Sequence, residues 1–302
     1  MAKAEKNALY DMGGKIAASL ASNPNMGLDS LRLLLEDLQS LSAEPTDVTY
    51  EEVDAGGIHA IWARPTGAAK DRVIVYTHGG GFVTNSAASH RKVAAHLAKQ
   101  AGVLALVIDY RLAPENPFPA QIEDAIKVHE WLRKQGFKPE ATAHAGDSAG
   151  GNLALSSALK MRELKMPLPA AIVTFSPWLD MESNGKSFQT NAESDVFIRR
   201  ETSVMMAGLY VGSASRTNPL ANPLHADLKG LPPLFVAVGD AEVLEDDARQ
   251  IVEKARAAGV DATLEFGPGQ QHVYPFMAGR SRAADTTLAN AGKWLRRQLK
   301  VG

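Results

Sequence analysis

Between residues 72 and 268 the chain alternates short, continuous apolar runs with longer amphipathic stretches. The apolar runs occupy residues 72–79, 103–110, 141–148, 170–177, 233–240 and 261–268. The stretches with helical periodicity cover residues 90–102, 121–136, 151–164, 245–259 and, at the end, 283–299. Continuous apolar strands separated by amphipathic helices indicate an α/β protein with a mostly parallel sheet covered on both faces.

The start of the chain has a different pattern. Residues 1–45 are expected to be helical, with leucines at helical spacing between residues 28 and 41, and Pro45 ends the segment. We interpret this leucine stripe as ordinary packing. Residues 48–65 predict two strands around a Gly-Gly turn, which brings the expected sheet to eight strands.

One interval breaks the alternation. The runs at 170–177 and 233–240 are separated by about 55 residues, more than a crossover helix needs. Residues 203–212 have a helical pattern inside this interval. The interval is therefore expected to be an insertion over one end of the sheet.

Composition narrows the classes of function. The chain has 302 residues, 45% hydrophobic and 22% charged, with a formal net charge of −2. This balance argues against nucleic acid or an anionic membrane as a partner. The absence of cysteine excludes a disulfide or a thiol nucleophile. The sequence also contains no H-E-x-x-H motif, the pattern that would indicate a zinc site. Because no apolar run could span a bilayer and no signal peptide is evident, we expect a cytoplasmic protein without stable membrane anchoring.

The stretch HAGDSAGGNLAL places Ser148 between two glycines, after an apolar run and before a helical one. A sharp strand-to-helix turn brings the flanking backbone close, so Gly146 and Gly150 are the residues that it requires sterically. Ligands of open parallel sheets bind beyond the carboxyl ends of the strands, where Ser148 is expected. The pattern alone is weak, but this context predicts a nucleophile.

A second glycine-rich segment, HGGG at residues 78–81, follows another apolar run. A plain turn needs one glycine, whereas backbone N–H groups that bind an oxyanion must approach it without a Cβ in the way. We therefore expect an oxyanion hole made by Gly80, Gly81 and the N–H of Ala149.

A serine nucleophile needs a base, and in hydrolases whose serine occupies such a strand-to-helix turn the histidine follows it in the chain. Only His225 and His272 follow Ser148, and His272 is in a glycine-rich loop directly after the last predicted strand. His272 is the predicted base. His90, in a predicted helix, is expected to be a surface or packing residue, and His144, in a strand, a core histidine.

The acid that orients the base is less well defined by spacing. Residues 245–247 fall in the first turn of a predicted helix, where acidic residues complement the helix dipole. Asp240 and Glu242 remain at the strand end, and spacing alone does not separate them.

Seven motifs together carry a resemblance to a known family. They are HGGGF (78–82), DYRLAPENPFPA (109–120), GDSAGG (146–151), SPWLD (176–180), GLPP (230–233), VLEDD (243–247) and HVYPF (272–276). Over residues 70–276 the chain resembles the bacterial hormone-sensitive-lipase-like (family IV) esterases of the α/β-hydrolase superfamily. The GDSAG motif is typical of one subgroup of that family.

The resemblance implies an α/β-hydrolase fold with a mostly parallel eight-stranded sheet flanked by helices. It further implies a helical cap built from residues 1–45 and from an insertion at about 181–218, over a catalytic core of residues 46–302. In the family pattern the acid lies two residues before Leu244, so Glu242 aligns with it, with Asp240 in reserve. Family members often pair through the last strand and helix, which makes a homodimer an expectation.

The function implied is that of a cofactor-free serine carboxylester hydrolase, acting on short- to medium-chain acyl esters through a Ser148–Glu242–His272 triad. Some apolar residues are candidate walls of the substrate pocket, with plain packing as the alternative for each: Phe82, Trp178, Phe197, Met205, Met206 and Tyr210. Two rival functions stay open. One is cleavage of a lactone, amide or carbonate by the same triad, and the other is ligand binding without catalysis.

Overall fold

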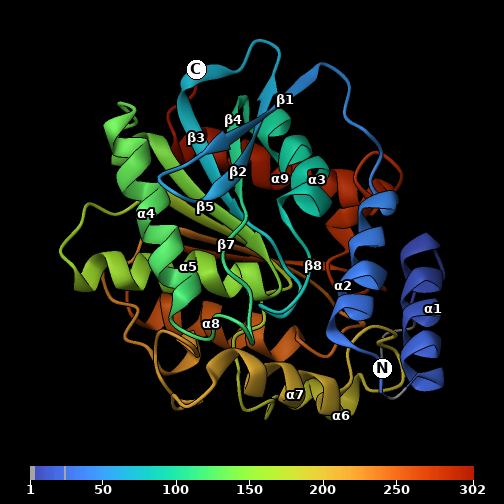
Figure 1. The fold of residues 1–302 in the computed structure, drawn as a ribbon. Coiled ribbons are helices and arrows are strands. Elements are labelled where there is room, and N and C mark those ends of the chain that lie inside the picture. The colour runs from blue at the N-terminus through green and yellow to red at the C-terminus, as the bar shows by residue number, and fades with distance from the viewer. Residues whose placement is uncertain (1–3, 24) are drawn as a thin grey trace.

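A single mixed sheet forms the centre of the molecule (Figure 1). The computed structural model describes residues 4–23 and 25–302. In that part of the chain eight strands pair in the order β1-β2-β4-β3-β5-β6-β7-β8. The strands are β1 (Val48–Asp54), β2 (His59–Pro65), β3 (Ala69–Thr77), β4 (Val103–Ile108), β5 (Thr142–Asp147), β6 (Ala171–Phe175), β7 (Leu234–Gly239) and β8 (Ala262–Gly267).

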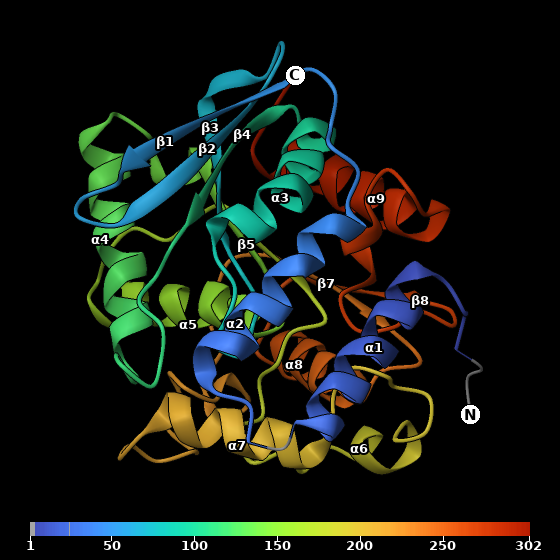
Figure 2. The same ribbon diagram turned by 45° about the vertical axis from the view of Figure 1, so that its right-hand side comes forward.

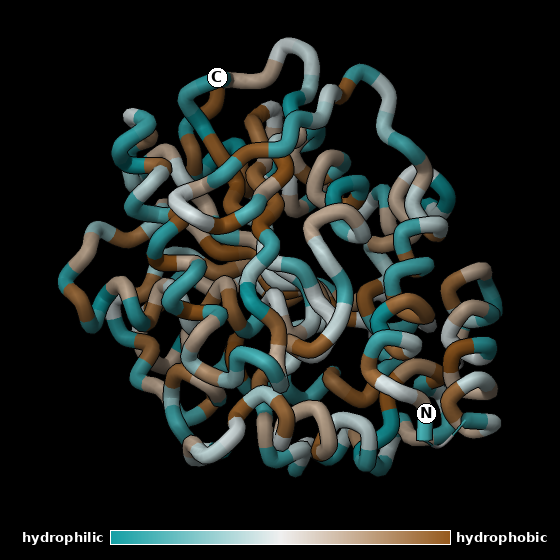
Figure 3. Tube along the Cα trace, viewed as in Figure 1, coloured by the Kyte–Doolittle hydropathy of each residue, from teal (hydrophilic) through white to brown (hydrophobic). Residues whose placement is uncertain are grey.

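The pairing confirms the α/β-hydrolase fold expected from the sequence. Strands β3 to β8 are parallel to their neighbours, whereas β1 and β2 form a hairpin that joins the sheet antiparallel to β4. Every residue of β4, β5, β6 and β7 is buried. These strands therefore lack the alternation of apolar and polar residues that a half-exposed strand has, because both of their faces are covered. Figure 3 shows the same concentration of hydrophobic positions on the central strands.

Five long helices cover the two faces of the sheet. They are α3 (Ala87–Ala101), α4 (Ala120–Lys134), α5 (Ala149–Glu163), α8 (Glu245–Ala257) and α9 (Arg282–Gln298). Side chains of α3 and α9 share one core cluster with one face of the sheet. Helices α4, α5 and α8 pack in two clusters on the opposite face. Because strands β3 to β8 run parallel to one another, their carboxyl ends lie at the same end of the sheet.

Two segments far apart in the sequence come together beside the carboxyl ends of the parallel strands (Figure 2). One is N-terminal and contains α1 (Ala8–Ser22), α2 (Leu28–Glu36) and the 3-10 helix η1 (Asp37–Leu41). The other lies between β6 and β7 and contains α6 (Ser187–Thr190) and α7 (Arg200–Val211). A Cβ on Gly13 of α1 would collide with the ring of Phe197, which precedes α7, so the two segments touch.

Three short 3-10 helices complete the described chain: η2 (Pro139–Ala141), η3 (Pro223–His225) and η4 (Tyr274–Met277). The last of them begins two residues after His272, in the loop between β8 and α9. Within residues 4–23 and 25–302 the structure has no helix that combines the length and the apolarity needed to cross a membrane.

Candidate active site

Ser148 occupies the turn between β5 and α5, with φ +51° and ψ −122°. This conformation is unfavourable for a residue with a side chain and needs the surrounding structure to hold it. The Ser148 N–H donates to the carbonyl oxygen of Phe175 (2.9 Å), and its own carbonyl oxygen accepts from the N–H of Trp178 (3.0 Å). A Cβ on Gly150 would overlap the carbonyl oxygen of Thr77. The glycine predicted from the sequence is therefore a steric requirement of this turn.

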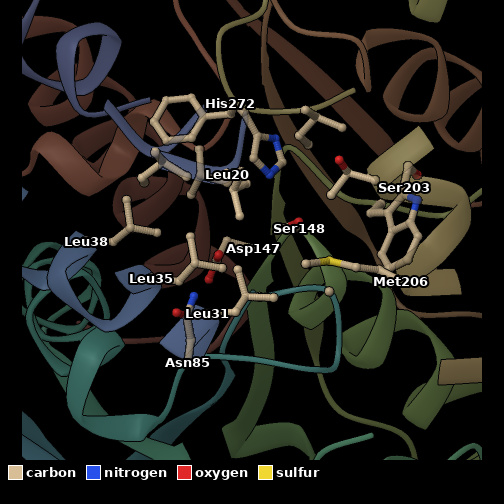
Figure 4. A pocket seen from close by; sticks show the side chains of 18 of the residues that line it. Leu20, Leu31, Leu35, Leu38, Asn85, Asp147, Ser148, Ser203, Met206 and His272 are labelled. Atoms are coloured by element: carbon tan, nitrogen blue, oxygen red, sulfur yellow. The ribbon is translucent and has the colours of Figure 1, made fainter. Parts of the chain in front are cut away.

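His272 and Glu242 meet at the same end of the sheet. The Nδ1 atom of His272 lies 2.6 Å from Oε2 of Glu242, which is fully buried. The other carboxylate oxygen of Glu242 accepts from the Ser176 hydroxyl (2.6 Å) and from the N–H of Gly239 (2.7 Å). With a proton on Nδ1, the Nε2 atom of His272 is free to accept one, and Figure 4 shows the imidazole pointing toward Ser148.

The environment of His272 favours its charged form. Burial disfavours the imidazolium, but the charge and hydrogen bond of Glu242 outweigh it, so that the pKa of His272 is raised above its ordinary value. Asp240, the other acid left open by the sequence, has a different partner: its Oδ1 accepts from the N–H of Gly269 (2.6 Å). The geometry therefore separates the two carboxylates that spacing could not.

The HGGG segment forms a tight loop beside Ser148. Gly80 and Gly81 have φ values of +109° and +63°, in the region that favours glycine. A Cβ on Gly80 would overlap the carbonyl oxygen of Thr84, and one on Gly81 would overlap the sulfur of Met206. Ala149 is the first residue of α5, so its N–H has no acceptor within the helix. The loop therefore adjoins the turn of Ser148 and the start of α5.

These groups open into a cavity of about 340 Å³, most of whose wall is apolar (Figure 4). Ser148, His272, Gly80 and Gly81 lie in its lining. The apolar part of the lining comes mainly from the N-terminal segment and from α7: Leu9, Ile16, Leu20, Met26, Leu31, Leu35, Leu38, Met205 and Met206. The cavity has the size and composition of a site for a small, largely apolar molecule.

Four of the six predicted wall residues line this cavity: Trp178, Phe197, Met205 and Met206. The other two do not, and for these the prediction is corrected. Phe82 and Tyr210 are fully buried and stack on each other, with ring centroids 3.7 Å apart and planes 10° from parallel. They join α7 to the end of the HGGG loop by packing, the alternative to lining the pocket.

The sequence did not identify the N-terminal leucines of the lining. Leu31, Leu35 and Leu38 recur at helical spacing, and we interpreted that stripe as ordinary packing. The spacing does show that these side chains share one face of the helical segment. It carries no signal that distinguishes a face packed on the core from a face that lines a cavity.

Two polar residues of the lining were also missed. His90, expected to be at the surface or in packing, is fully buried, and its Nε2 lies 3.1 Å from the backbone nitrogen of Gly79. Asp147 accepts from the Tyr76 hydroxyl (2.9 Å), and its Oδ2 lies 3.3 Å from His90 Nε2. Burial would raise the pKa of Asp147, but His90 and Tyr76 outweigh it, and the pKa is lowered. Both residues therefore pack against Gly79 of the HGGG loop.

In the chain apart from residues 1–3 and 24, no three side chains of His, Asp or Glu gather in a group that could hold a metal ion. The cavity lining instead contains the Ser148 hydroxyl, the His272 imidazole and two glycines, and the Glu242 carboxylate lies behind the imidazole. Those are the parts of nucleophilic acyl-transfer chemistry.

Known proteins share both the sequence and the fold. A family profile described as the alpha/beta hydrolase fold matches residues 74–276. An acetyl-hydrolase of Streptomyces hygroscopicus is 40% identical over 240 residues, covering 79% of this chain and 78% of that protein. An esterase of Acinetobacter venetianus is 31% identical, with 90% of each chain covered.

Solved structures agree with this assignment. An esterase from the bacterial hormone-sensitive lipase family superposes with a TM-score of 0.92 at 41% identity, covering 98% of this chain and 99% of that one. A second structure, an esterase/lipase from an uncultured bacterium, gives a TM-score of 0.89 at 35% identity, covering 98% and 100%. The chain therefore belongs to the α/β-hydrolase fold family, among the bacterial hormone-sensitive-lipase-like esterases.

Proposed function

We propose that the protein is a serine carboxylester hydrolase with Ser148 as nucleophile, His272 as base and Glu242 as the acid that orients it. The observation that carries this proposal is the 2.6 Å contact between His272 Nδ1 and Glu242 Oε2, because His272 lines the same cavity as Ser148. Such a contact fixes the tautomer that leaves Nε2 to act on the serine hydroxyl.

In the first half of the reaction, His272 Nε2 removes the hydroxyl proton as Ser148 Oγ attacks the ester carbonyl. The N–H groups of Gly80, Gly81 and Ala149 stabilise the resulting oxyanion. His272 then gives the proton to the leaving alcohol, and the acyl group stays on Ser148. In the second half, water attacks the acyl-enzyme by the same steps and releases the acid.

We propose short- to medium-chain acyl esters as substrates, with residues 1–45 and 181–218 as a cap over the catalytic core of residues 46–302. Residues 1–3 and 24 of that cap lie outside the described residues. The apolar lining supplied by α1, α2 and α7 supports this proposal, because it encloses room for a hydrocarbon chain next to Ser148. One relative, the acetyl-hydrolase of Streptomyces hygroscopicus, is named for a short acyl group.

A homodimer through the last strand is also proposed. Strand β8 forms one edge of the sheet, so its outer backbone groups have no neighbouring strand within the described chain. A monomeric mass in solution scattering would contradict this assembly.

The experiment that tests the proposed function measures hydrolysis of p-nitrophenyl esters from acetate to laurate by the purified protein and by Ser148→Ala. We expect turnover that peaks on the shorter chains and disappears in the variant, with thermal unfolding nearly unchanged. Retained turnover in Ser148→Ala would remove Ser148 from the mechanism. Absence of turnover in well-folded wild-type protein would favour a lactone, amide or carbonate substrate, or binding without catalysis.

A further inference from the structure

The segment between α6 and α7, residues 191–198, touches the loop that carries the proposed acid. The side-chain amide of Asn191 donates to the carbonyl oxygen of Glu242 (2.8 Å). On the next residue of that loop, the N–H of Val243 donates to Oδ2 of Asp195 (2.8 Å). We call residues 191–198 the tie segment. It therefore binds both polar groups of the peptide bond that joins Glu242 to Val243.

The tie segment also holds the loop that carries the proposed base. Gln271, directly before His272, is fully buried. Its Oε1 accepts from the N–H of Val196 (2.9 Å), and its Nε2 donates to the carbonyl oxygen of Ser194 (2.8 Å). One stretch of the insertion thus connects two loops that follow different strands of the sheet, and these are the loops of the acid and of the base.

Asp195 is the fully buried centre of the tie segment. Its Oδ1 accepts from the N–H groups of Phe197 (2.7 Å) and Ile198 (2.9 Å), in addition to the bond from Val243 to Oδ2. Burial raises the pKa of Asp195, and the bonds from Ile198 and Val243 act against that rise. All three partners are backbone donors, which suits an ionised carboxylate, because a protonated one would bring a further donor.

Three carboxylates from different elements favour the charged form of His272: Glu242 after β7, Asp195 in the tie segment and Asp147 at the end of β5. Burial works against the imidazolium, and all three carboxylates, Glu242 most strongly, work for it, so that the pKa of His272 is raised. Asp195 thus contributes negative charge to the surroundings of the base, although its carboxylate forms no hydrogen bond with His272 or Ser148.

We propose that Asp195 and Gln271 are positioning residues of the active site, and this rests on the proposed function. Asp195 supplements Glu242 in stabilising the imidazolium that forms when His272 takes the proton of Ser148. Gln271 holds the loop of His272 against the tie segment, so that Glu242 and His272 keep their positions relative to each other. Neither residue touches the ester, and so each acts on the rate of the proton transfer and little on substrate binding.

The test compares wild type with Asp195→Asn, using p-nitrophenyl butyrate followed at the isosbestic wavelength of p-nitrophenol. We expect kcat to fall about tenfold with KM changed less than about twofold. The acidic limb of kcat/KM against pH should move to lower pH by about half a unit or more, because the base loses a negative neighbour. Asp195→Glu keeps the charge and should restore the position of the limb.

Asp240→Asn is the matched control. It also replaces a carboxylate that accepts one N–H in the loop after β7, but that carboxylate is bonded to Gly269. Its acidic limb should stay where it is in wild type. Folded Asp195→Asn with the wild-type limb would overturn the role of the charge, whether or not kcat falls, because a structural loss alone would not move the limb.

Gln271→Met tests the other half of the inference without changing any charge, and it also serves if Asp195→Asn does not fold. It should lower kcat several-fold while KM and the acidic limb stay in place; wild-type kcat would overturn the tie. A wild-type protein that hydrolyses no ester would contradict the proposed function itself. Active wild type with insensitive variants at both positions would contradict only this inference.

Discussion

The Nδ1 atom of His272 lies 2.6 Å from Oε2 of Glu242, although the two residues belong to loops that follow different strands. Glu242 is held in turn by the hydroxyl of Ser176 and the N–H of Gly239. A glutamate side chain has one more rotatable bond than an aspartate. Because Oε1 is held by these two donors, the carboxylate is oriented so that Oε2 meets the imidazole.

Replacing the acid should therefore reduce catalysis strongly. Glu242→Gln puts an amide beside His272 Nδ1 and allows the wrong tautomer, so we expect kcat to fall by about a hundredfold to ten-thousandfold. Asp240→Asn should have a small effect, because its carboxylate is bonded to Gly269. Steady-state kinetics of the two variants check this, and the reverse ranking would transfer the role to Asp240.

The oxyanion loop should not tolerate a side chain. Gly80 has φ +109°, and a Cβ there would overlap the backbone carbonyl oxygen of Thr84. Gly80→Ala is expected to lower kcat by about a hundredfold or more, since a displaced donor no longer meets the oxyanion. Gly57→Ala is the control, with φ +90° but open space around it. It should cost about 1 kcal/mol of stability and leave kcat alone; equal losses of activity in both variants would contradict this account.

Chain-length preference should depend on the inner face of α2. Leu35 lines the cavity, whereas Leu33 on the same helix is 76% exposed. Leu35→Trp is expected to lower kcat/KM for p-nitrophenyl decanoate by about tenfold relative to the acetate, because it fills space that a long chain needs. Leu33→Trp should leave the ratio unchanged. A ratio that moves equally in both variants would show that the cavity wall does not select chain length.

Buried histidines should make the fold sensitive to acid. Burial lowers the pKa of His144 and of His78 to about 4, and it places that of His129 well below the ordinary value. The folded state then binds fewer protons than the unfolded state between about pH 4 and 6.5. Each such histidine lowers the free energy of unfolding by about 1.4 kcal/mol per unit of falling pH in that window.

Urea unfolding across the same window checks this dependence. His144→Gln should flatten the loss of stability with falling pH, even if it lowers stability at neutral pH. His225→Gln, which changes a histidine at the surface, is the control and should keep the wild-type slope. Identical slopes in wild type and His144→Gln would mean that His144 is not kept neutral by burial.

Much of the architecture follows from local chemistry that the sequence displays. The apolar runs became strands β3 to β8, and the glycines around Ser148 were required by the contacts of the turn itself. The preference for Glu242 over Asp240 needed the resemblance or the structure. Two acidic residues so close in one loop differ in the direction of their side chains, which the sequence does not reveal. Hydrophobicity likewise could not tell the stacked pair Phe82 and Tyr210 from true wall residues.

Other features depend on contacts between distant segments. Asp195 stands in a polar stretch of the insertion, where a carboxylate beside a helix has many ordinary explanations. Its importance arises only when the insertion meets the loop of Val243, 48 positions later in the chain. Such tertiary hydrogen bonds have no periodicity and no local motif, so the sequence of one chain does not reveal them.

The most direct test of the central claim is covalent labelling with diethyl p-nitrophenyl phosphate, followed by mass spectrometry of the intact protein and of its peptides. The account predicts one diethylphosphoryl group per chain, located on Ser148, and a greatly slowed reaction in His272→Asn, because the hydroxyl then lacks its base. Labelling at another residue, or none in folded wild-type protein, would contradict the assignment of Ser148 as an activated nucleophile.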